Sequence, residues 1–378
     1  MTDRLDLFAI TAPGLEPLVE RELHALGAHD ARAEPGGVAF VGAREMMYRA
    51  NLHLRTASRI VVRVADFGAR GFPELVRHVK RHPWERYLDP HRPVRLRVTC
   101  KKSRLYHSDA VAERVREGIA ARTGAGAADG GGENESEEGQ LLVVRMAHDR
   151  CLISIDSSGE LLHRRGYREA SAKAPIRETL AAALLLAVDW RGATPVLDPF
   201  CGSGTIAIEA ALLARRMAPG MQRRFAFMEW PDFDPDQWAD IHGAAARGVL
   251  PRAPAAILGS DRDAGAIDAA RANAARAGVA DDITFEQQAV SAIHPPDEPG
   301  WISTNPPYGV RVSERVELRN LYAQLGKVLR AKCAGWNVAM FSADPRLERA
   351  TGLTFRRVLS TVNGGIPVRV VSATIGDH

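Results

Sequence analysis

The chain has 378 residues, of which 46% are hydrophobic and 25% are charged. This balance is typical of globular proteins and excludes a disordered, collagen-like or disulfide-based chain. The length predicts two or three domains, and the formal net charge of +4 is too small to indicate nucleic-acid binding by itself. No run approaches the roughly 18 apolar residues of a membrane helix, and the first residues lack the apolar core of a signal peptide. We therefore expect a cytoplasmic protein that does not bind membranes.

The four cysteines stand far apart, without a CxxC pair and without histidine at metal-ligand spacing. In a reducing cytosol such residues stay thiols, and we expect them to be buried and to bind no metal. They are Cys100, Cys151, Cys201 and Cys333.

The first half of the chain mixes strand and helix patterns without regular alternation. Apolar spacing predicts helices at 15–26, 74–80 and 110–121, and apolar runs predict strands at 7–10, 37–41, 60–64, 94–99, 141–146 and 152–155. This mixture is typical of small α+β domains. Residues 123–140 are rich in glycine and acids and have almost nothing to bury, so we expect a mobile surface loop there.

From about residue 174 onward, strand and helix patterns alternate. Helical patterns separate apolar runs at 194–198, 256–261, 283–287, 301–304 and 336–341, which indicates a parallel sheet. Two final β runs, at 355–360 and 366–375, are joined through Asn363-Gly364-Gly365, a hairpin signal that requires positive φ. A parallel sheet that finishes in an antiparallel hairpin differs from the all-parallel arrangement of a dinucleotide-binding domain.

The segment 196–207 reads VLDPFCGSGTIA and runs from a strand through a tight turn into a helix. Gly202 and Gly204 allow a ligand to approach the backbone closely, and the helix N-terminus offers free N–H groups. An NAD site would need an acid about 20 residues further on, whereas the next strand-end acid is the distant Asp261. Asp198 would repel a pyrophosphate and suits a ligand that carries an ammonium group.

S-adenosylmethionine is such a ligand, with a sulfonium and an amino-acid head, a ribose and an adenine. We expect Asp261 to bind the ribose hydroxyls and Gln288, near the end of the third strand, to bind the adenine edge. The alternative for Asp261 is a helix N-cap before 264–275, although Asp263 is the stronger cap candidate.

The fourth strand is followed by TNPPYG at 304–309. The prolines stiffen the chain, so the Asn305 side-chain oxygen and the Pro306 backbone oxygen can together accept both hydrogens of an exocyclic amine. Acceptors placed off the ring plane stabilise the charge that develops as a methyl group is transferred. Tyr308 offers a face for base stacking, and with Pro307 these residues form the predicted catalytic set. The alternative is a plain Asn-Pro turn.

DPFCGSGT and NPPY together resemble class I S-adenosylmethionine-dependent methyltransferases. More narrowly, the chain resembles the THUMP-domain RNA guanine-N2 methyltransferases, which include a module acting on bacterial 23S ribosomal RNA and tRNA enzymes. This resemblance covers nearly the whole chain. It is carried by HRRGYR at 163–168, KAPIRE at 173–178, RRFAF at 223–227 and WPDF at 230–233.

The resemblance implies three domains: a ferredoxin-like domain at 1–55, completed by about 156–170, a THUMP RNA-binding domain at 56–155, and a Rossmann-like methyltransferase domain with a seven-stranded sheet at 171–378. It also implies that the cofactor is S-adenosylmethionine. Gln288 stands where relatives commonly have Asp. The implied cofactor-binding residues are Asp198, Phe200, Gly202, Gly204, Thr205, Asp261, Gln288, Pro175 and Ile176.

Basic residues gather in the second module, between 77 and 104, where only two acids occur. Trp84, Tyr87 and Tyr106 are interleaved with them as candidate stacking surfaces, which together indicates a face that follows RNA phosphates. Arginines of the 163–168 segment could extend this face toward the active site. The predicted RNA-binding residues are Lys101, Lys102, Arg104, Arg164, Arg165 and Arg168.

We therefore expect a monomeric enzyme that methylates the N2 amine of a guanine in structured RNA, with 23S ribosomal RNA favoured over tRNA. The target base must be single-stranded or flipped, because an amine inside a helix cannot reach a closed pocket. The alternatives are an N6-adenine methyltransferase acting on DNA or RNA, a protein glutamine methylase, and a non-catalytic RNA-binding protein.

Overall fold

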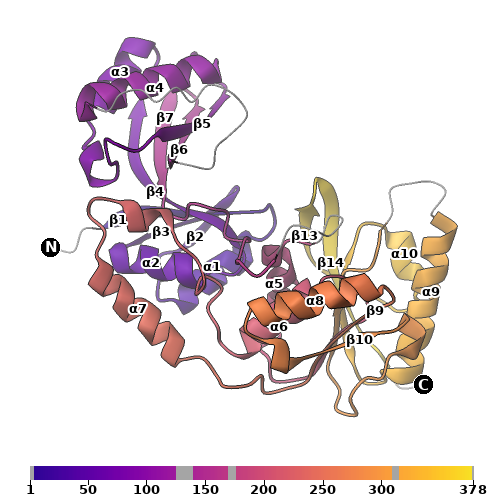
Figure 1. Cartoon of the computed structure of the whole chain (residues 1–378). Coiled ribbons are helices and arrows are strands. Elements are labelled where there is room, and N and C mark those ends of the chain that lie inside the picture. The colour runs from indigo at the N-terminus through magenta and orange to yellow at the C-terminus, as the bar shows by residue number, and fades with distance from the viewer. Residues whose placement is uncertain (1–3, 125–138, 169–175, 309–314, 377–378) are drawn as a thin grey trace.

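Two seven-stranded sheets organise the chain in the computed structural model, which describes residues 4–124, 139–168, 176–308 and 315–376 (Figure 1). The loop predicted at 123–140 lies mostly outside these residues. Within the described parts of the chain, no helix combines the length and the hydropathy needed to cross a membrane. All four cysteines are free, and only Cys100 is not fully buried.

The first sheet has the strand order β2-β3-β1-β4-β7-β6-β5. The alternation predicted for its strands is visible in β1, where every second side chain from Leu5 is buried. Helices α1 (Glu16–Ala25) and α2 (Arg44–His53) lie at one end of this sheet, and α3 (Phe72–Arg81) and α4 (Ser108–Thr123) at the other (Figure 1). The strands are β1 Leu5–Thr11, β2 Arg32–Glu34, β3 Gly37–Gly42, β4 Ala57–Gly68, β5 Val94–Lys101, β6 Gln140–Ala147 and β7 Arg150–Asp156.

Strand β4 joins the two ends of the first sheet. Its first half pairs with β1, from Ala57 to Val62, and its second half pairs with β7, from Val61 to Gly68. The end that carries α1 and α2 and the end that carries α3 and α4 are therefore parts of one hydrogen-bonded sheet.

The second sheet has the order β10-β9-β8-β11-β12-β14-β13, and β8 to β12 are parallel. The final hairpin is antiparallel, and Asn363 pairs with Ile366 across Gly364 and Gly365, whose φ values of +56° and +84° confirm the predicted turn. The predicted seven-stranded sheet is thus confirmed. Its strands are β8 Val196–Asp198, β9 Ile257–Asp261, β10 Ile283–Gln287, β11 Trp301–Thr304, β12 Asn337–Ser342, β13 Arg356–Asn363 and β14 Ile366–Thr374.

Helices cover both faces of this sheet. Helices α5 (Glu178–Ala187) and α6 (Thr205–Ala214) are apolar on nearly all sides and almost entirely buried. The others are α8 (Ala264–Arg276), α9 (Arg315–Lys332) and α10 (Pro345–Ala350). From β8 the chain adds β9 and β10 on one side of the sheet and then β11 and β12 on the other, so the strand order reverses at β8. Ligands of parallel α/β sheets bind at the carboxyl ends of the strands next to such a reversal.

A segment between α6 and β9 reaches back to the first half of the chain, where α7 (Pro235–Arg247) packs against α2 (Figure 1). Tyr48 of α2 stacks on Phe227 with ring centroids 4.5 Å apart, and Trp230 Nε1 donates to Gln140 Oε1 at 2.8 Å. These contacts fix the two halves of the protein against each other.

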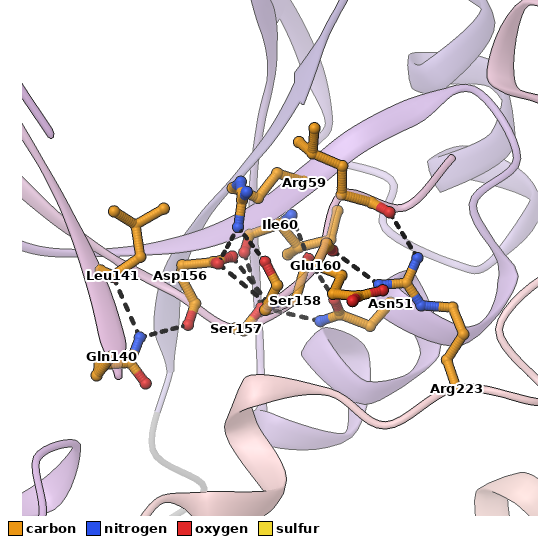
Figure 2. A network of polar contacts seen from close by, with 12 residues as sticks. Asn51, Arg59, Ile60, Gln140, Leu141, Asp156, Ser157, Ser158, Glu160 and Arg223 are labelled. Atoms are coloured by element: carbon orange, nitrogen blue, oxygen red, sulfur yellow. Dashed lines mark hydrogen bonds and ion pairs between the residues drawn. The ribbon is translucent and has the colours of Figure 1, made fainter. Parts of the chain in front are cut away.

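A buried polar network closes the junction at the end of β7, as Figure 2 shows. Asn51 Nδ2 donates to Ser157 Oγ at 2.9 Å, and Ser158 Oγ donates to Asn51 Oδ1 at 2.6 Å. Arg59 pairs with Asp156, which also accepts from the Ser158 backbone N–H at 2.9 Å. The network holds the start of the segment that leads into the second sheet.

Candidate active site

The carboxyl ends of four parallel strands bring the predicted residues to one edge of the second sheet. Asp198 ends β8 and Asp261 ends β9, while Gln288 and Asn305 directly follow β10 and β11. The register places Asp198 beside Gly259, and Gln287 beside Asp261. The predicted convergence of these side chains therefore follows from the strand order.

The two glycines of the loop after β8 serve different purposes. Both have positive φ, +52° for Gly202 and +83° for Gly204. A Cβ atom on Gly204 would come within 3.0 Å of Ala270 and of the Phe285 ring, so this position must be glycine for α6 to pack. A Cβ on Gly202 would meet nothing within 4 Å. The open side for a ligand is therefore at Gly202.

The Asp261 carboxylate holds this loop against β9. It accepts hydrogen bonds from the backbone N–H groups of Gly202 and Asp263, each at 3.0 Å. Asp263 is the N-cap of α8, because its side chain accepts from Gly265 N at 2.8 Å, so the stronger cap candidate is the cap that forms. A carboxylate has about four acceptor positions, so Asp261 retains capacity for ligand hydroxyls.

Asp198 is a buried carboxylate without a cationic partner among the described residues. It is 2% exposed, and its Oδ1 accepts from Thr304 Oγ1 at 2.6 Å and from Phe200 N at 3.1 Å. Burial raises the pKa of Asp198 to about 7 against the effect of these two hydrogen bonds, and the Asp261 charge raises it further. A cationic ligand at this edge would stabilise the ionised form.

The Asn305 side-chain oxygen is buried and has no hydrogen-bond partner among the described residues. Leaving such an acceptor unsatisfied costs about 1–3 kcal/mol, so a donor from a ligand or from water should pair with it. The neighbouring Pro306 is buried, whereas Pro307 is exposed. A ligand that donates a hydrogen bond would satisfy the Asn305 oxygen.

Tyr308 is half-buried, and the β13–β14 turn holds it. Asn363 Nδ2 donates to the Tyr308 hydroxyl oxygen at 2.7 Å. Burial raises the pKa of Tyr308 above its ordinary value, so the ring stays neutral. Asn363 was predicted only as a turn residue, because nothing local to the hairpin indicates that it reaches the segment after β11.

Four of the remaining predicted cofactor residues, Gln288, Phe200, Ile176 and Thr205, lie in the described part of the chain. Gln288 donates its backbone N–H to Asp261 O at 2.9 Å and its side-chain Nε2 to Glu286 Oε2 at 2.9 Å. Phe200 is partly buried, Ile176 is buried, and Thr205 begins α6. Pro175 lies outside the described residues.

Of the predicted RNA-binding arginines, Arg165 lies in the interior, which corrects the prediction for it, whereas Arg168 is partly exposed. Arg165 is 3% exposed, donates to Leu162 O and Arg55 O at 2.6 Å each, and pairs with Glu209 at 3.4 Å. Arg168 donates to Thr205 Oγ1 at 2.6 Å and to the Ile176 carbonyl oxygen at 2.9 Å. The Arg165 guanidinium therefore stabilises the protein instead of facing a surface, and that of Arg168 is held by hydrogen bonds within the protein.

Of the other predicted RNA contacts, the four cations Lys101, Lys102, Arg104 and Arg164 are exposed. The three aromatic residues predicted to stack on RNA also differ in how exposed they are. Trp84 is fully buried with its indole N–H donated to Val79 O at 2.7 Å, and Tyr87 packs edge-on against Trp230. Tyr106, at 68% exposed, is the member of the three that offers a surface.

No cluster of His, Cys, Asp or Glu within the described ranges could hold a metal ion.

A family model described as the RMKL-like methyltransferase domain matches residues 165–371, more than half of the chain. The chain belongs to this RMKL-like methyltransferase family. A second family model, described as the RlmL ferredoxin-like domain, matches residues 6–61 of the same chain. The predicted family is thereby confirmed.

Relatives match the protein over nearly its whole length. The protein slr0064 of Synechocystis sp., provisionally named an RNA methyltransferase, is 35% identical over 95% of this chain and 94% of its own length. The ribosomal RNA large subunit methyltransferase K/L of Syntrophotalea carbinolica is 34% identical over 99% of this chain. The chain spans only 54% of that protein.

Among solved structures, SMU.472 is similar from end to end. It is provisionally described as a methyltransferase complexed with SAH, is 30% identical, and superposes with a TM-score of 0.88 over 100% of this chain and 99% of its own. SAH is what S-adenosylmethionine becomes once its methyl group has left. The predicted class I fold and cofactor are thus confirmed, and the RMKL-like methyltransferase is an S-adenosylmethionine-dependent enzyme.

Proposed function

We propose that this RMKL-like methyltransferase methylates the exocyclic N2 amine of a guanine in the RNA of the large ribosomal subunit. The observation that carries the proposal is the unpartnered Asn305 oxygen at the end of β11. It needs a hydrogen-bond donor, and an amine that is being methylated is such a donor. The names of two relatives support RNA as the substrate, and one of them supports ribosomal RNA.

The residues around Asp198 fit the cofactor. S-adenosylmethionine supplies an electrophilic methyl group on a positively charged sulfur. The ionised Asp198 would stabilise the cationic methionyl end, the open side of Gly202 allows close approach, and Asp261 retains acceptors for the ribose. Gln288 would contact the adenine after exchanging its bond to Glu286. Phe200, Thr205 and Ile176 complete the proposed pocket with Pro175.

The amine is held by two oxygens on a rigid support. Asn305 Oδ1 and the Pro306 carbonyl oxygen accept its two hydrogens, which directs the nitrogen lone pair toward the methyl carbon. The N–C bond forms as the C–S bond breaks, and the nitrogen then loses its proton to water. No strong base is required, because the proton leaves after the transfer. Pro307 stiffens the segment, and Tyr308 stacks on the base.

The first half of the chain would hold the RNA, with residues 56–155 acting as a THUMP domain. Lys101, Lys102 and Arg104 are exposed at the end of β5. A groove of about 860 Å³ between α3 and α4 adds a basic surface. Its cationic lining comprises Arg77, Lys80, Arg81, Arg114 and Arg122. Because β4 continues from one end of the first sheet to the other, RNA held there has a fixed position relative to the end of that sheet on which α7 packs.

Nucleoside mass spectrometry tests the proposal. The full chain is incubated with S-adenosylmethionine and unmodified ribosomal RNA, and the RNA is then digested to nucleosides. We expect N2-methylguanosine; N6-methyladenosine would overturn the choice of base, and methylated tRNA alone would overturn the choice of RNA.

A matched pair of variants tests the role of the Asn305 oxygen. Asn305→Ala should abolish methylation but keep RNA affinity within about twofold. Asn337→Ala, at the amino end of β12 where Asn337 Oδ1 accepts from Thr374 Oγ1 at 2.8 Å, should remain active. Equal loss in both variants would contradict the assigned role.

A further inference from the structure

A second hollow lies directly beside Tyr308, on the side of the catalytic segment that faces α9 and α10. It has a volume of about 900 Å³. The side chains that matter for its chemistry are Tyr308, Leu318, Arg319, Arg346, Arg349 and Ile366. We call this the arginine hollow. It opens where α9 begins, where β12 turns into α10, and where β14 starts.

The arginine hollow carries an excess of positive charge. Arg319, Arg346 and Arg349 are all exposed. The acid among its lining residues, Asp344, already caps α10 by accepting from Arg346 N at 2.8 Å, and it lies 3.7 Å from the Arg346 side chain. Arg319 and Arg349 form no ion pair with any described residue. Three guanidinium groups around one engaged carboxylate leave a site for an anion.

The neighbouring acid of α10 does not reduce this charge, because it is engaged elsewhere. Glu348 pairs with Arg369 of β14 at 2.7 Å. The free guanidinium groups of Arg319 and Arg349 can therefore act on a ligand, and their planar donor geometry matches phosphate oxygens.

The walls of the hollow between these arginines are apolar. Leu318 comes from α9, Leu347 from α10 and Ile366 from β14, and the Tyr308 side chain forms the border with the active site. An apolar surface rimmed by guanidinium groups suits a nucleotide, whose base is flat and poorly hydrated and whose phosphate is charged. The hollow suits a free phosphate less well, because a phosphate would make no favourable contact with the apolar walls.

We propose that the arginine hollow binds the RNA nucleotide next to the methylated one. Its phosphate lies on Arg319 and Arg349, with Arg346 alongside, and its base rests against Leu318, Leu347 and Ile366. This inference rests on the proposed function, because Tyr308 borders both sites and an occupant of the hollow would be continuous with the target base. The neighbouring nucleotide then helps to select the target.

The double variant Arg319→Gln/Arg349→Gln tests this inference in the full chain with its RNA substrate. We expect KM for RNA to rise about tenfold or more, with kcat at saturating RNA and the Kd for S-adenosylmethionine unchanged. The slope of log affinity against log salt should fall by about 0.7 for each lost phosphate contact. Arg319→Lys/Arg349→Lys should restore most of the affinity, because it keeps the charge.

The matched control is Arg356→Gln/Arg357→Gln, which removes the same charge from exposed positions at the far end of β13 from the hairpin turn. The inference is overturned if KM is unchanged in the first variant, or if it rises equally in the control. These outcomes are distinguishable from failure of the proposed function, in which the wild-type protein itself methylates no RNA. An unchanged KM together with binding of an acidic peptide would assign the hollow to a protein partner instead.

Discussion

Replacing Glu209 by glutamine would test the buried ion pair that joins the two halves of the protein. The Arg165 and Glu209 side chains are 3% and 0% exposed, and Arg165 Nε lies 3.4 Å from Glu209 Oε1, which also accepts from the Tyr167 hydroxyl at 3.2 Å. A second cation, Arg55, is buried nearby, and the Glu209 charge raises its pKa against the larger lowering by burial. A neutral glutamine would leave the buried guanidinium groups of Arg165 and Arg55 without the negative charge of Glu209 beside them.

The expected cost follows from this geometry. Removing one partner of a buried pair typically costs about 3–5 kcal/mol, because the other charge remains buried. Arg165 keeps its bonds to the carbonyl oxygens of Leu162 and Arg55, so we expect the lower end, about 3 kcal/mol. The free energy of unfolding from urea titration, followed by tryptophan fluorescence, measures this change.

A surface pair provides the control for this measurement. Arg164 and Glu160 lie 3.8 Å apart with 50% and 56% of their side chains exposed. Exposed pairs contribute about 0–1 kcal/mol, so Glu160→Gln should hardly change the stability. If Glu209→Gln cost less than about 1 kcal/mol, the assignment of a stabilising role to the buried pair would be refuted.

Three further predictions concern the active site. Thr304→Val keeps the side-chain shape but removes a hydrogen bond to the buried Asp198, so calorimetry at pH 7 should show S-adenosylmethionine binding about tenfold or more weakly; unchanged affinity would contradict the role of this bond. Since the pKa of Asp198 is raised to about 7, the folded protein binds an extra proton between about pH 4 and 7. The contribution of Asp198 to the free energy of unfolding, measured as the difference between the protein and Asp198→Asn, should therefore fall as pH rises through that range. Cofactor affinity should rise from pH 6 to 8, and a stability difference that stays constant with pH would refute the assignment. Asn363→Ala removes the hydrogen bond that the Tyr308 hydroxyl accepts from Asn363, so kinetic assays should show a higher KM for RNA with unchanged cofactor affinity, and loss of cofactor binding would show a different role for Asn363.

The strands of the second sheet could be predicted because their signals are local. Apolar runs end in polar residues at Asp198, Asp261 and Thr304, and parallel pairing then brings these ends to one edge. The Gly364-Gly365 turn and the Asp263 cap follow equally from residues within one turn of the chain. The sheet, and the edge at which the predicted site residues lie, could therefore be predicted from sequence.

Burial of polar and aromatic residues could not be predicted, because it depends on distant partners. Arg165 is internal because Glu209 of α6 lies opposite it, and Trp84 is internal because Val79 O satisfies its indole N–H. Neither partner is recognisable from the local pattern, in which arginines and aromatics suggest a surface for RNA. Likewise, no local signal shows that α7 returns to pack on α2.

A crystal structure of the protein with SAH and an RNA oligonucleotide containing the target guanine would test the central claim most directly. The account predicts that the guanine N2 lies within hydrogen-bonding distance of Asn305 Oδ1 and the Pro306 carbonyl oxygen, facing the sulfur of SAH. A base bound with its amine turned away from both oxygens would contradict it.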